Sequence, residues 1–385
     1  MLIEDGKTVV YCRDTEAKTI TIPEGIEMIG EYAFRDCTAL RQVTLPASLR
    51  VIGAHAFEKC SLREVTLPDG LEKIGRCAFR DVLLRITPAV NGLEACEGVA
   101  LRGMAGHPHF CVRGDLLLSA DGKTAVWYLG DGGSELAVPE GVEEIGDYAF
   151  SFCSHMSRIS FPASVSSIGK NVFSFCEILS KIDVAADSPY YKAVNNVLFT
   201  KDGSTLVACP MSRSGSYTIP EGVTAIAAYA FSCSDLSSVT FPEGLETIGE
   251  YAFDVSKNLK SVTLPDSVTT IGDYAFCACY GLTKVTLPKG ITRIGSCTFA
   301  DCSGLGSITI PEGVVVIGGS AFHRCESLAS IDLPQSLAKI GYHAFEGCSR
   351  LSTVRFKGSQ ALWNQVADEG GNEPLKDAKI TFNAP

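Results

Sequence analysis

Apolar residues recur along this chain in one pattern, L-x-x-V-T-L-P-x-x-V-x-x-I-G-x-x-A-F-x-x-C, in which most x positions are polar. Each copy contains a short alternation of apolar and polar residues, which predicts a half-buried β-strand. The phenylalanine marks eleven copies, most of them 22 or 23 residues apart: Phe34, Phe57, Phe79, Phe150, Phe173, Phe231, Phe253, Phe276, Phe299, Phe322 and Phe345. A fixed period of this length predicts a repeat protein with eleven turns.

Residues 40–62 illustrate the structure expected for one turn. The alternation in Val43-Thr44-Leu45 directs the first and third side chains inward and the threonine outward. Pro46 ends the strand, because proline has no N–H for the next ladder bond. Gly53 is expected to allow a tight bend before Ala56-Phe57 enter the core. One turn cannot bury this set alone, so equivalent positions must stack into ladders.

A period in this range predicts a leucine-rich-repeat solenoid, with short parallel strands on one face and short helical or irregular segments on the other. Two insertions carry an Asp-Gly pair between apolar stretches, at Asp121-Gly122 and Asp202-Gly203, and residues 2–12 match the second of them. Asp-Gly in this setting predicts a β-hairpin. We expect these hairpins to pack on the edge of the solenoid.

The expected organisation is one elongated solenoid over residues 1–385. Its parts are an N-terminal hairpin cap at 1–19, repeats 1–3 at 20–85, an insertion with a hairpin at 86–136, repeats 4–5 at 137–182, a second insertion with a hairpin at 183–216, repeats 6–11 at 217–356 and a C-terminal cap at 357–385. In the cap the repeat pattern ends, and Trp363, Leu375, Ile380 and Phe382 are expected to cover the last turn.

One unit carries a resemblance to a known family. Residues 282–295, Leu-Thr-Lys-Val-Thr-Leu-Pro-Lys-Gly-Ile-Thr-Arg-Ile-Gly, followed by Thr298-Phe299 and Cys302, resemble the Treponema-type leucine-rich repeat of BspA-like bacterial surface proteins. The hairpin interruptions and residues 360–375 also resemble segments of that family, so the resemblance covers nearly the whole chain. It implies a cell-surface or secreted bacterial protein that adheres to a host or bacterial surface protein or to a glycan.

Charge and hydropathy narrow the partners. The net charge is -11 and the sequence has no basic block, so we expect no nucleic-acid partner. No apolar run is long enough to cross a bilayer, so we expect no membrane insertion. The start lacks the pattern of a signal peptide, although Met1 begins inside a structural unit and an upstream leader stays open. We expect a monomer.

No enzyme motif is present: the sequence lacks G-x-S-x-G, the phosphate-binding G-x-x-x-x-G-K-[ST], H-E-x-x-H and G-x-G-x-x-G after a strand. We therefore expect neither catalysis nor a cofactor. Two alternatives to an adhesion module stay open. One is an intracellular protein-protein interaction scaffold, which the missing leader favours, and the other is a hydrolase that uses Cys111 with His107 or His109.

Nine of the 16 cysteines follow the marker phenylalanine by two or three residues: Cys37, Cys60, Cys153, Cys176, Cys233, Cys279, Cys302, Cys325 and Cys348. This regularity predicts a ladder of small buried side chains, in which thiols are favoured over disulfides. The segment His107-Pro108-His109-Phe110-Cys111 is a cluster of possible zinc ligands, but it lacks a fourth ligand, so an ordinary loop is the expected reading.

Three sets of residues are candidates for a binding surface. Tyr148, Tyr229, Tyr251 and Tyr274 occupy the position two residues before the marker phenylalanine, where they either cover the core edge or offer exposed rings to a glycan or protein. Asp332 and Arg355 replace the usual threonine at the outward strand position. Arg113-Gly114-Asp115 spells the tripeptide read by integrins. Aligned with the second insertion, Asp115 coincides with Val197 at a strand entry, which favours a structural role unless the tripeptide forms a loop tip.

Overall fold

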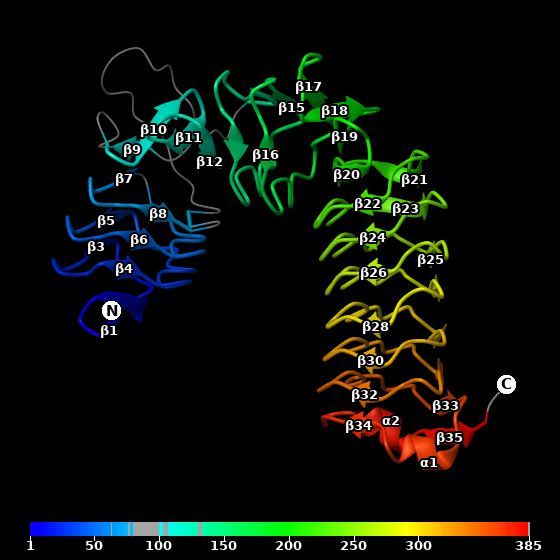
Figure 1. Ribbon diagram of the computed structural model, residues 1–385. Coiled ribbons are helices and arrows are strands. Elements are labelled where there is room, and N and C mark those ends of the chain that lie inside the picture. The colour runs from blue at the N-terminus through cyan, green and yellow to red at the C-terminus, as the bar shows by residue number, and fades with distance from the viewer. Residues whose placement is uncertain (63, 76–77, 80–99, 103–106, 130–132, 384–385) are drawn as a thin grey trace. The chain divides into compact units, whose positions relative to one another are not determined.

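The computed structural model describes residues 1–383 except 63, 76–77, 80–99, 103–106 and 130–132 (Figure 1). The chain divides into two compact units, Met1–Ile178 and Leu179–Pro385. The architecture is a parallel β-solenoid, as the repeat predicted, but it has about 15 turns where the phenylalanines indicated eleven. The described residues hold two short helices, α1 (Gln360–Trp363) and α2 (Glu373–Asp377), and neither has the length to cross a membrane.

Each turn contributes one strand to each of two parallel rows. The first row forms mainly from the Val-Thr segments, and in most of its strands an apolar residue such as Val43, Ile159 or Val262 is buried in the core. In the first unit it comprises β3 (Thr19–Thr21), β5 (Gln42–Thr44), β7 (Glu64–Thr66), β9 (Ala100–Arg102), β13 (Glu135–Ala137) and β15 (Arg158–Phe161). In the second unit it comprises β21 (Ser214–Thr218), β23 (Asp235–Thr240), β25 (Ser261–Thr263), β27 (Lys284–Thr286), β29 (Ser307–Thr309), β31 (Ser330–Leu333), β33 (Thr353–Phe356) and β35 (Lys379–Phe382).

The second row forms from two-residue strands, all of which except β34 end at the isoleucine of the repeat, usually the one before glycine. Its members are β4 (Met28–Ile29), β6 (Val51–Ile52), β8 (Lys73–Ile74), β14 (Glu144–Ile145), β16 (Ser167–Ile168), β22 (Ala225–Ile226), β24 (Thr247–Ile248), β26 (Thr270–Ile271), β28 (Arg293–Ile294), β30 (Val316–Ile317), β32 (Lys339–Ile340) and β34 (Ala367–Asp368). The described parts of this side are two-residue strands joined by turns.

The hairpin modules are integral turns of the solenoid, not attachments to its edge. They comprise β1 (Leu2–Glu4) with β2 (Thr8–Tyr11), then β10 (Phe110–Arg113), β11 (Leu116–Ser119) and β12 (Thr124–Tyr128), and finally β18 (Tyr191–Val194), β19 (Val197–Thr200) and β20 (Thr205–Ala208), which β17 (Lys181–Val184) precedes. The last strand of each module pairs in parallel with the next two-residue strand, β2 with β4, β12 with β14 and β20 with β22. These strands and β34 extend the second row beyond the eleven turns counted from phenylalanines.

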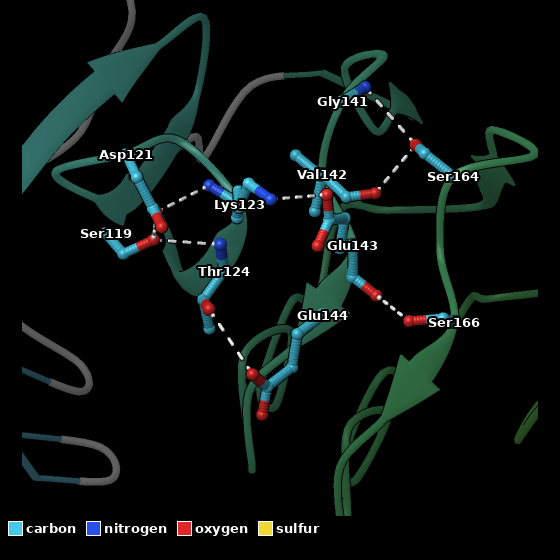
Figure 2. Close-up of polar contacts among 10 residues, drawn as sticks. All are labelled: Ser119, Asp121, Lys123, Thr124, Gly141, Val142, Glu143, Glu144, Ser164 and Ser166. Atoms are coloured by element: carbon cyan, nitrogen blue, oxygen red, sulfur yellow. Dashed lines mark hydrogen bonds and ion pairs between the residues drawn. The ribbon is translucent and has the colours of Figure 1, made fainter.

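Local hydrogen bonds shape the second module and join it to the next turn (Figure 2). Asp121 accepts hydrogen bonds from the Ser119 hydroxyl at 2.6 Å and from the Lys123 N–H at 3.0 Å, which closes the Asp-Gly turn. The Lys123 carbonyl accepts from the Glu143 N–H at 2.7 Å, and the Lys123 ammonium contacts the Glu143 carboxylate at 2.7 Å. The Asp-Gly signal therefore predicted the turn, whereas the pairing with a distant turn was visible only in the structure.

Each unit has its own apolar core, lined by a stack of the marker phenylalanines. In the second unit successive rings from Phe231 to Phe345 lie 4.8 to 5.6 Å apart, with interplanar angles of 5 to 14°. In the first unit the Trp127 indole of the second hairpin module stacks on Phe79 at 5.5 Å. Stacked aromatic pairs stabilise the fold by about 0.5–1.5 kcal/mol beyond the burial of their area.

The segment around each marker phenylalanine bonds to the next turn without forming a strand. Tyr251, Phe253 and Val255 donate their N–H groups to the carbonyls of Asp273, Ala275 and Cys277, at 3.1, 2.7 and 2.9 Å. The intervening N–H groups bond locally, three residues back. This alternation requires the left-handed conformation at Tyr251 (φ 56°) and Val255 (φ 59°), and the equivalent residues of other turns share it. Inter-turn bonding thus imposes a backbone conformation that these residue types rarely adopt alone.

The cysteine ladder is a hydrogen-bonded feature of this segment. Six buried thiols donate to the carbonyl of the marker phenylalanine one turn earlier, at 2.9 to 3.2 Å: Cys60, Cys176, Cys279, Cys302, Cys325 and Cys348. Ser256 makes the same bond to Phe231 at 2.9 Å. Cys233 was wrongly assigned to the ladder, because Ser234 occupies the equivalent buried position and Cys233 has the left-handed conformation. Burial raises the pKa of Cys348 to about 12, which disfavours the reactive thiolate.

The glycine of the Ile-Gly pair is required for close approach between turns, not for the bend that we expected. Gly53 does not have a positive φ, and a Cβ atom there would lie 2.7 Å from the Gly30 carbonyl carbon. At Gly272 the same atom would lie 2.5 Å from the Glu250 backbone nitrogen. These neighbours are backbone atoms of the preceding turn, so they cannot move aside without disturbing the inter-turn ladder.

The ladder ends on a side chain. Asn372 is fully buried, and its Oδ1 accepts a hydrogen bond from the Phe345 N–H at 3.0 Å. In other turns the N–H of the marker phenylalanine bonds to a carbonyl of the next turn. Its Nδ2 donates to the carbonyls of Gly341 and Gly370, at 3.1 and 3.2 Å. Leu375 of α2 is buried, and Trp363, Ile380 and Phe382 pack against the core. Asn372 therefore replaces the missing turn for the last phenylalanine.

We expect Gly272→Ala to lower the free energy of unfolding by about 1–3 kcal/mol, because the added methyl group overlaps the backbone of the preceding turn. Gly244→Ala, one turn away, is the matched control, since its added methyl group meets no atom within 4 Å and its φ is not positive. Thermal and urea unfolding of both variants measure the difference. Equal stabilities would contradict the close-approach explanation.

We expect Asn372→Ala to destabilise the second unit by about 1–3 kcal/mol, because it leaves the buried Phe345 N–H without its acceptor. Exposed Asn364→Ala should change stability by less than about 0.5 kcal/mol. Amide hydrogen exchange gives a local measurement: exchange of the Phe345 amide should accelerate in the first variant alone. Unchanged protection there would show that Asn372 does not terminate the ladder.

Candidate functional site

Three of the four predicted tyrosines form one contiguous feature, which we call the tyrosine row: Tyr229, Tyr251 and Tyr274. Each lies three residues after the end of β22, β24 or β26 and has the left-handed conformation, with φ of 62, 56 and 60°. Each N–H bonds to a carbonyl of the next turn, that of Glu250, Asp273 or Ser296. The two residues that follow each tyrosine are a buried Ala-Phe pair, which fixes the segment to the core and keeps the tyrosine at its surface.

The rings of the tyrosine row stack face to face along the solenoid. The centroids of Tyr229 and Tyr251 lie 4.8 Å apart at an interplanar angle of 3°, and those of Tyr251 and Tyr274 lie 4.5 Å apart at 9°. Both faces of the Tyr251 ring are therefore covered, and all three residues are partly buried. At Tyr251 the stacking leaves only the ring edge uncovered by neighbouring rings, which disfavours the stacking of a sugar on that ring.

Burial and neighbouring groups raise the pKa of two phenols of the row, those of Tyr251 and Tyr274. Burial, assisted by the nearby Asp254 carboxylate, raises the pKa of Tyr251. A hydrogen bond with Cys297 raises the pKa of Tyr274. Burial also raises the pKa of Asp254 to about 6. Phenol groups that stay protonated can both donate and accept hydrogen bonds.

Other polar and aromatic side chains lie on the same turns as the tyrosine row. Tyr280, on the turn that carries Tyr274, is 51% exposed. Glu250 is exposed, whereas the Asp273 carboxylate contacts the Arg293 guanidinium at 2.9 Å. The surface around the row therefore combines aromatic side chains and hydroxyl groups with few charges. Protein-protein contact surfaces have a similar composition and are rich in tyrosine.

The other predicted residues lie elsewhere. Tyr148 has the same left-handed conformation (φ 61°), but it belongs to the first unit and Asn171 occupies the equivalent position of the next turn. Asp332 and Arg355 are opposite each other on β31 and β33, where their side chains form an ion pair, and Thr309 donates to Asp332 at 3.1 Å. This pairing gives Asp332 and Arg355 a structural role within the sheet.

Arg113-Gly114-Asp115 lies at a hairpin tip. The predicted alignment of this module with the third one, which matched Asp115 to Val197, is therefore wrong by one residue. Arg113 pairs with Leu116, so Gly114 and Asp115 are the two turn residues between β10 and β11. The third module has Asn195 and Asn196 at its corresponding tip, between Val194 and Val197. Val197 therefore corresponds to Leu116, not to Asp115.

The imidazole and thiol cluster has structural contacts. His107 is buried, its Nε2 lies 3.0 Å from the Pro68 carbonyl, and its Nδ1 accepts the His109 N–H at 3.2 Å. The Cys111 thiol donates to the Ser119 carbonyl at 3.2 Å. In the described part of the chain, no three His, Cys, Asp or Glu side chains are grouped so that they could hold a metal ion. Only residues 107–109 form the expected loop, because Phe110 and Cys111 begin β10.

A depression on the first strand row offers little room for a small ligand. It measures about 220 Å³ and is lined by Gln42, Val43, Thr44, Leu45, Thr66 and Pro68 of the β5 and β7 turns. Pockets for small molecules usually enclose about 300–1,000 Å³. An extended surface is therefore the better candidate for binding than this pocket.

The sequence pattern missed a second aromatic pair. Phe152 and Phe175 follow their marker phenylalanines by two residues, have φ of 64 and 57°, and stack at 4.5 Å. Phe175 is 37% exposed. Their position varies in residue type from turn to turn, so no periodic signal marked it.

Comparisons with known proteins agree with this geometry. The family described as BspA type leucine rich repeat region matches residues 8–88, 131–204, 211–282 and 269–366, in six copies. A leucine-rich repeat protein from Eubacterium ventriosum ATCC 27560 is 24% identical, with a TM-score of 0.60 over 97% of this chain and 85% of the other. A leucine rich cell surface protein from Faecalibacterium prausnitzii A2-165 is 28% identical, with a TM-score of 0.52 over 96% of both chains. No curated protein matches the chain. The chain belongs to the BspA-type leucine-rich-repeat family.

Proposed function

We propose that this protein is a non-catalytic binding module of a bacterial surface or secreted protein, which adheres to a protein partner through the extended edge of its solenoid. The tyrosine row carries the proposal. Tyrosines supply large, rigid contact area and hydrogen-bonding hydroxyl groups, and they dominate the energetics of many protein interfaces. The likeness to a structure described as a leucine rich cell surface protein supports placement at the cell surface.

Geometry favours a protein over a glycan as the partner. Sugars bind tyrosine mainly by stacking on a ring face, but stacked neighbours cover both faces of Tyr251. The exposed edges and hydroxyl groups are suited to the side chains and backbone of another protein. Continuous contact along several turns is the usual mode of binding for solenoids.

Buried thiols are compatible with an oxidising location. A thiol-rich interior would favour the intracellular scaffold if its thiolates were accessible. The ladder thiols, however, are buried and hydrogen-bonded, and burial raises the pKa of Cys302 and Cys325 well above the usual value. Thiol exchange requires an accessible thiolate, so these groups are protected from it.

Arrays of immobilised extracellular-matrix proteins and of glycans test the function with the full chain as probe. We expect saturable binding to one or more of the immobilised proteins. We expect no binding to the immobilised glycans. Binding to glycans alone would contradict the assignment of a protein partner. Uniform absence of binding to both arrays would contradict the adhesion function.

We expect Tyr251→Ser to weaken binding to the protein identified by the array by about 30-fold, the loss typical of a hot-spot side chain. Serine is compatible with the fold, because Ser320 occupies the equivalent position with φ of 54°. Tyr190→Ala is the matched control, since this tyrosine is 48% exposed and lies outside the row. Surface plasmon resonance gives the dissociation constants, and circular dichroism checks folding. Equal weakening by both variants would exclude the row as the contact site.

A further inference from the structure

The Arg113-Gly114-Asp115 hairpin tip is a second candidate site, separate from the tyrosine row. The tripeptide occurs at the end of β10 and in the two-residue turn to β11. Arg113 and Gly114 are exposed and Asp115 is partly exposed. Both charged residues therefore lie at or beside the tip of the hairpin.

The scaffold holds this tip in one conformation. Leu116, Leu117 and Leu118 of β11 are fully buried, so the strand that leaves the turn is fixed in the core. The Asp115 carbonyl accepts the Leu129 N–H at 2.7 Å, which ties the turn to the end of β12. A binding segment that is ordered before contact loses less conformational entropy on binding, which favours affinity.

The fold itself does not demand glycine at the tip. Gly114 has φ of 55°, but the equivalent Asn195 adopts φ of 50° in the third module. A Cβ atom at Gly114 would meet no atom within 4 Å, so the backbone faces open space. A partner can consequently approach the backbone at Gly114 closely, which a larger side chain would prevent.

We propose that this tip binds a receptor of the integrin class, which reads the tripeptide Arg-Gly-Asp. The Asp115 carboxylate is an oxygen ligand for a divalent cation held by the receptor. The Arg113 guanidinium offers paired N–H donors to a receptor carboxylate. In the free chain its guanidinium packs beside Gly122, in the turn between β11 and β12, so only the Arg113 side chain has to change its contacts for the receptor to bind it. This site does not rest on the tyrosine row, which lies in the other unit.

Binding of the full chain to an immobilised integrin ectodomain that reads Arg-Gly-Asp, in Mn²⁺ or in EDTA, tests the proposal. We expect binding in Mn²⁺ that EDTA and a linear Arg-Gly-Asp peptide abolish. Asp115→Glu should weaken binding by roughly 30-fold or more, because the longer side chain displaces the carboxylate from the cation. Gly114→Asn should weaken it similarly while keeping the turn conformation that Asn195 adopts.

Asn195→Gly, at the sibling tip, is the matched control and should leave binding unchanged. Thermal unfolding establishes whether Gly114→Asn is folded, and Asp115→Glu decides the outcome if it is not. The proposal is overturned if the unmodified chain shows no Mn²⁺-dependent binding, or if Asp115→Glu binds equally well. Tyr251→Ser should not affect this binding, so failure here and failure of the tyrosine-row function are distinguishable.

Discussion

Backbone hydrogen bonding between successive turns is the interaction on which this structure depends. Two strand rows supply part of it, and the segment around each marker phenylalanine supplies the rest through alternating inter-turn and local bonds. The turns must approach so closely that a Cβ atom at Gly272 would overlap the preceding backbone. Side chains at equivalent positions are therefore brought within stacking distance, whatever their chemistry. The phenylalanine, cysteine and tyrosine columns are all consequences of this spacing.

That spacing also decides what each column can do chemically. Ladder thiols reach the phenylalanine carbonyl of the preceding turn, which satisfies both groups and leaves the thiols unreactive. Tyrosine rings on successive turns stack face to face, and both faces of the Tyr251 ring are covered. The proposed preference for a protein partner over a sugar follows from this stacking, because a covered ring has no face to offer to a sugar.

A ladder of this kind needs a beginning and an end. The hairpin modules supply strands that pair with the next turn, so each module introduces a new stretch of solenoid and displays its own turns to solvent. At the other end Asn372 supplies the acceptor that a further turn would have provided. Departures from the repeat are therefore of two kinds. Some, such as Asn372, provide a hydrogen-bond partner to a backbone group of the ladder, and others, such as the Arg113-Gly114-Asp115 tip, lie outside the ladder.

The sequence by itself determined the features that depend on local pattern and period: the Val-Thr strands, the proline that ends them, the buried phenylalanine and cysteine columns, and the Asp-Gly turns. It also located the tyrosines of the row. Only the tertiary structure decided which groups of neighbouring turns meet. Four features depend on contacts between residues about one turn apart in sequence. They are the left-handed conformation at Tyr251, the close approach at Gly272, the ion pair of Asp332 with Arg355 and the contact of Asn372 with Phe345. Their partners are fixed by the register between turns, which a pattern within one turn does not contain.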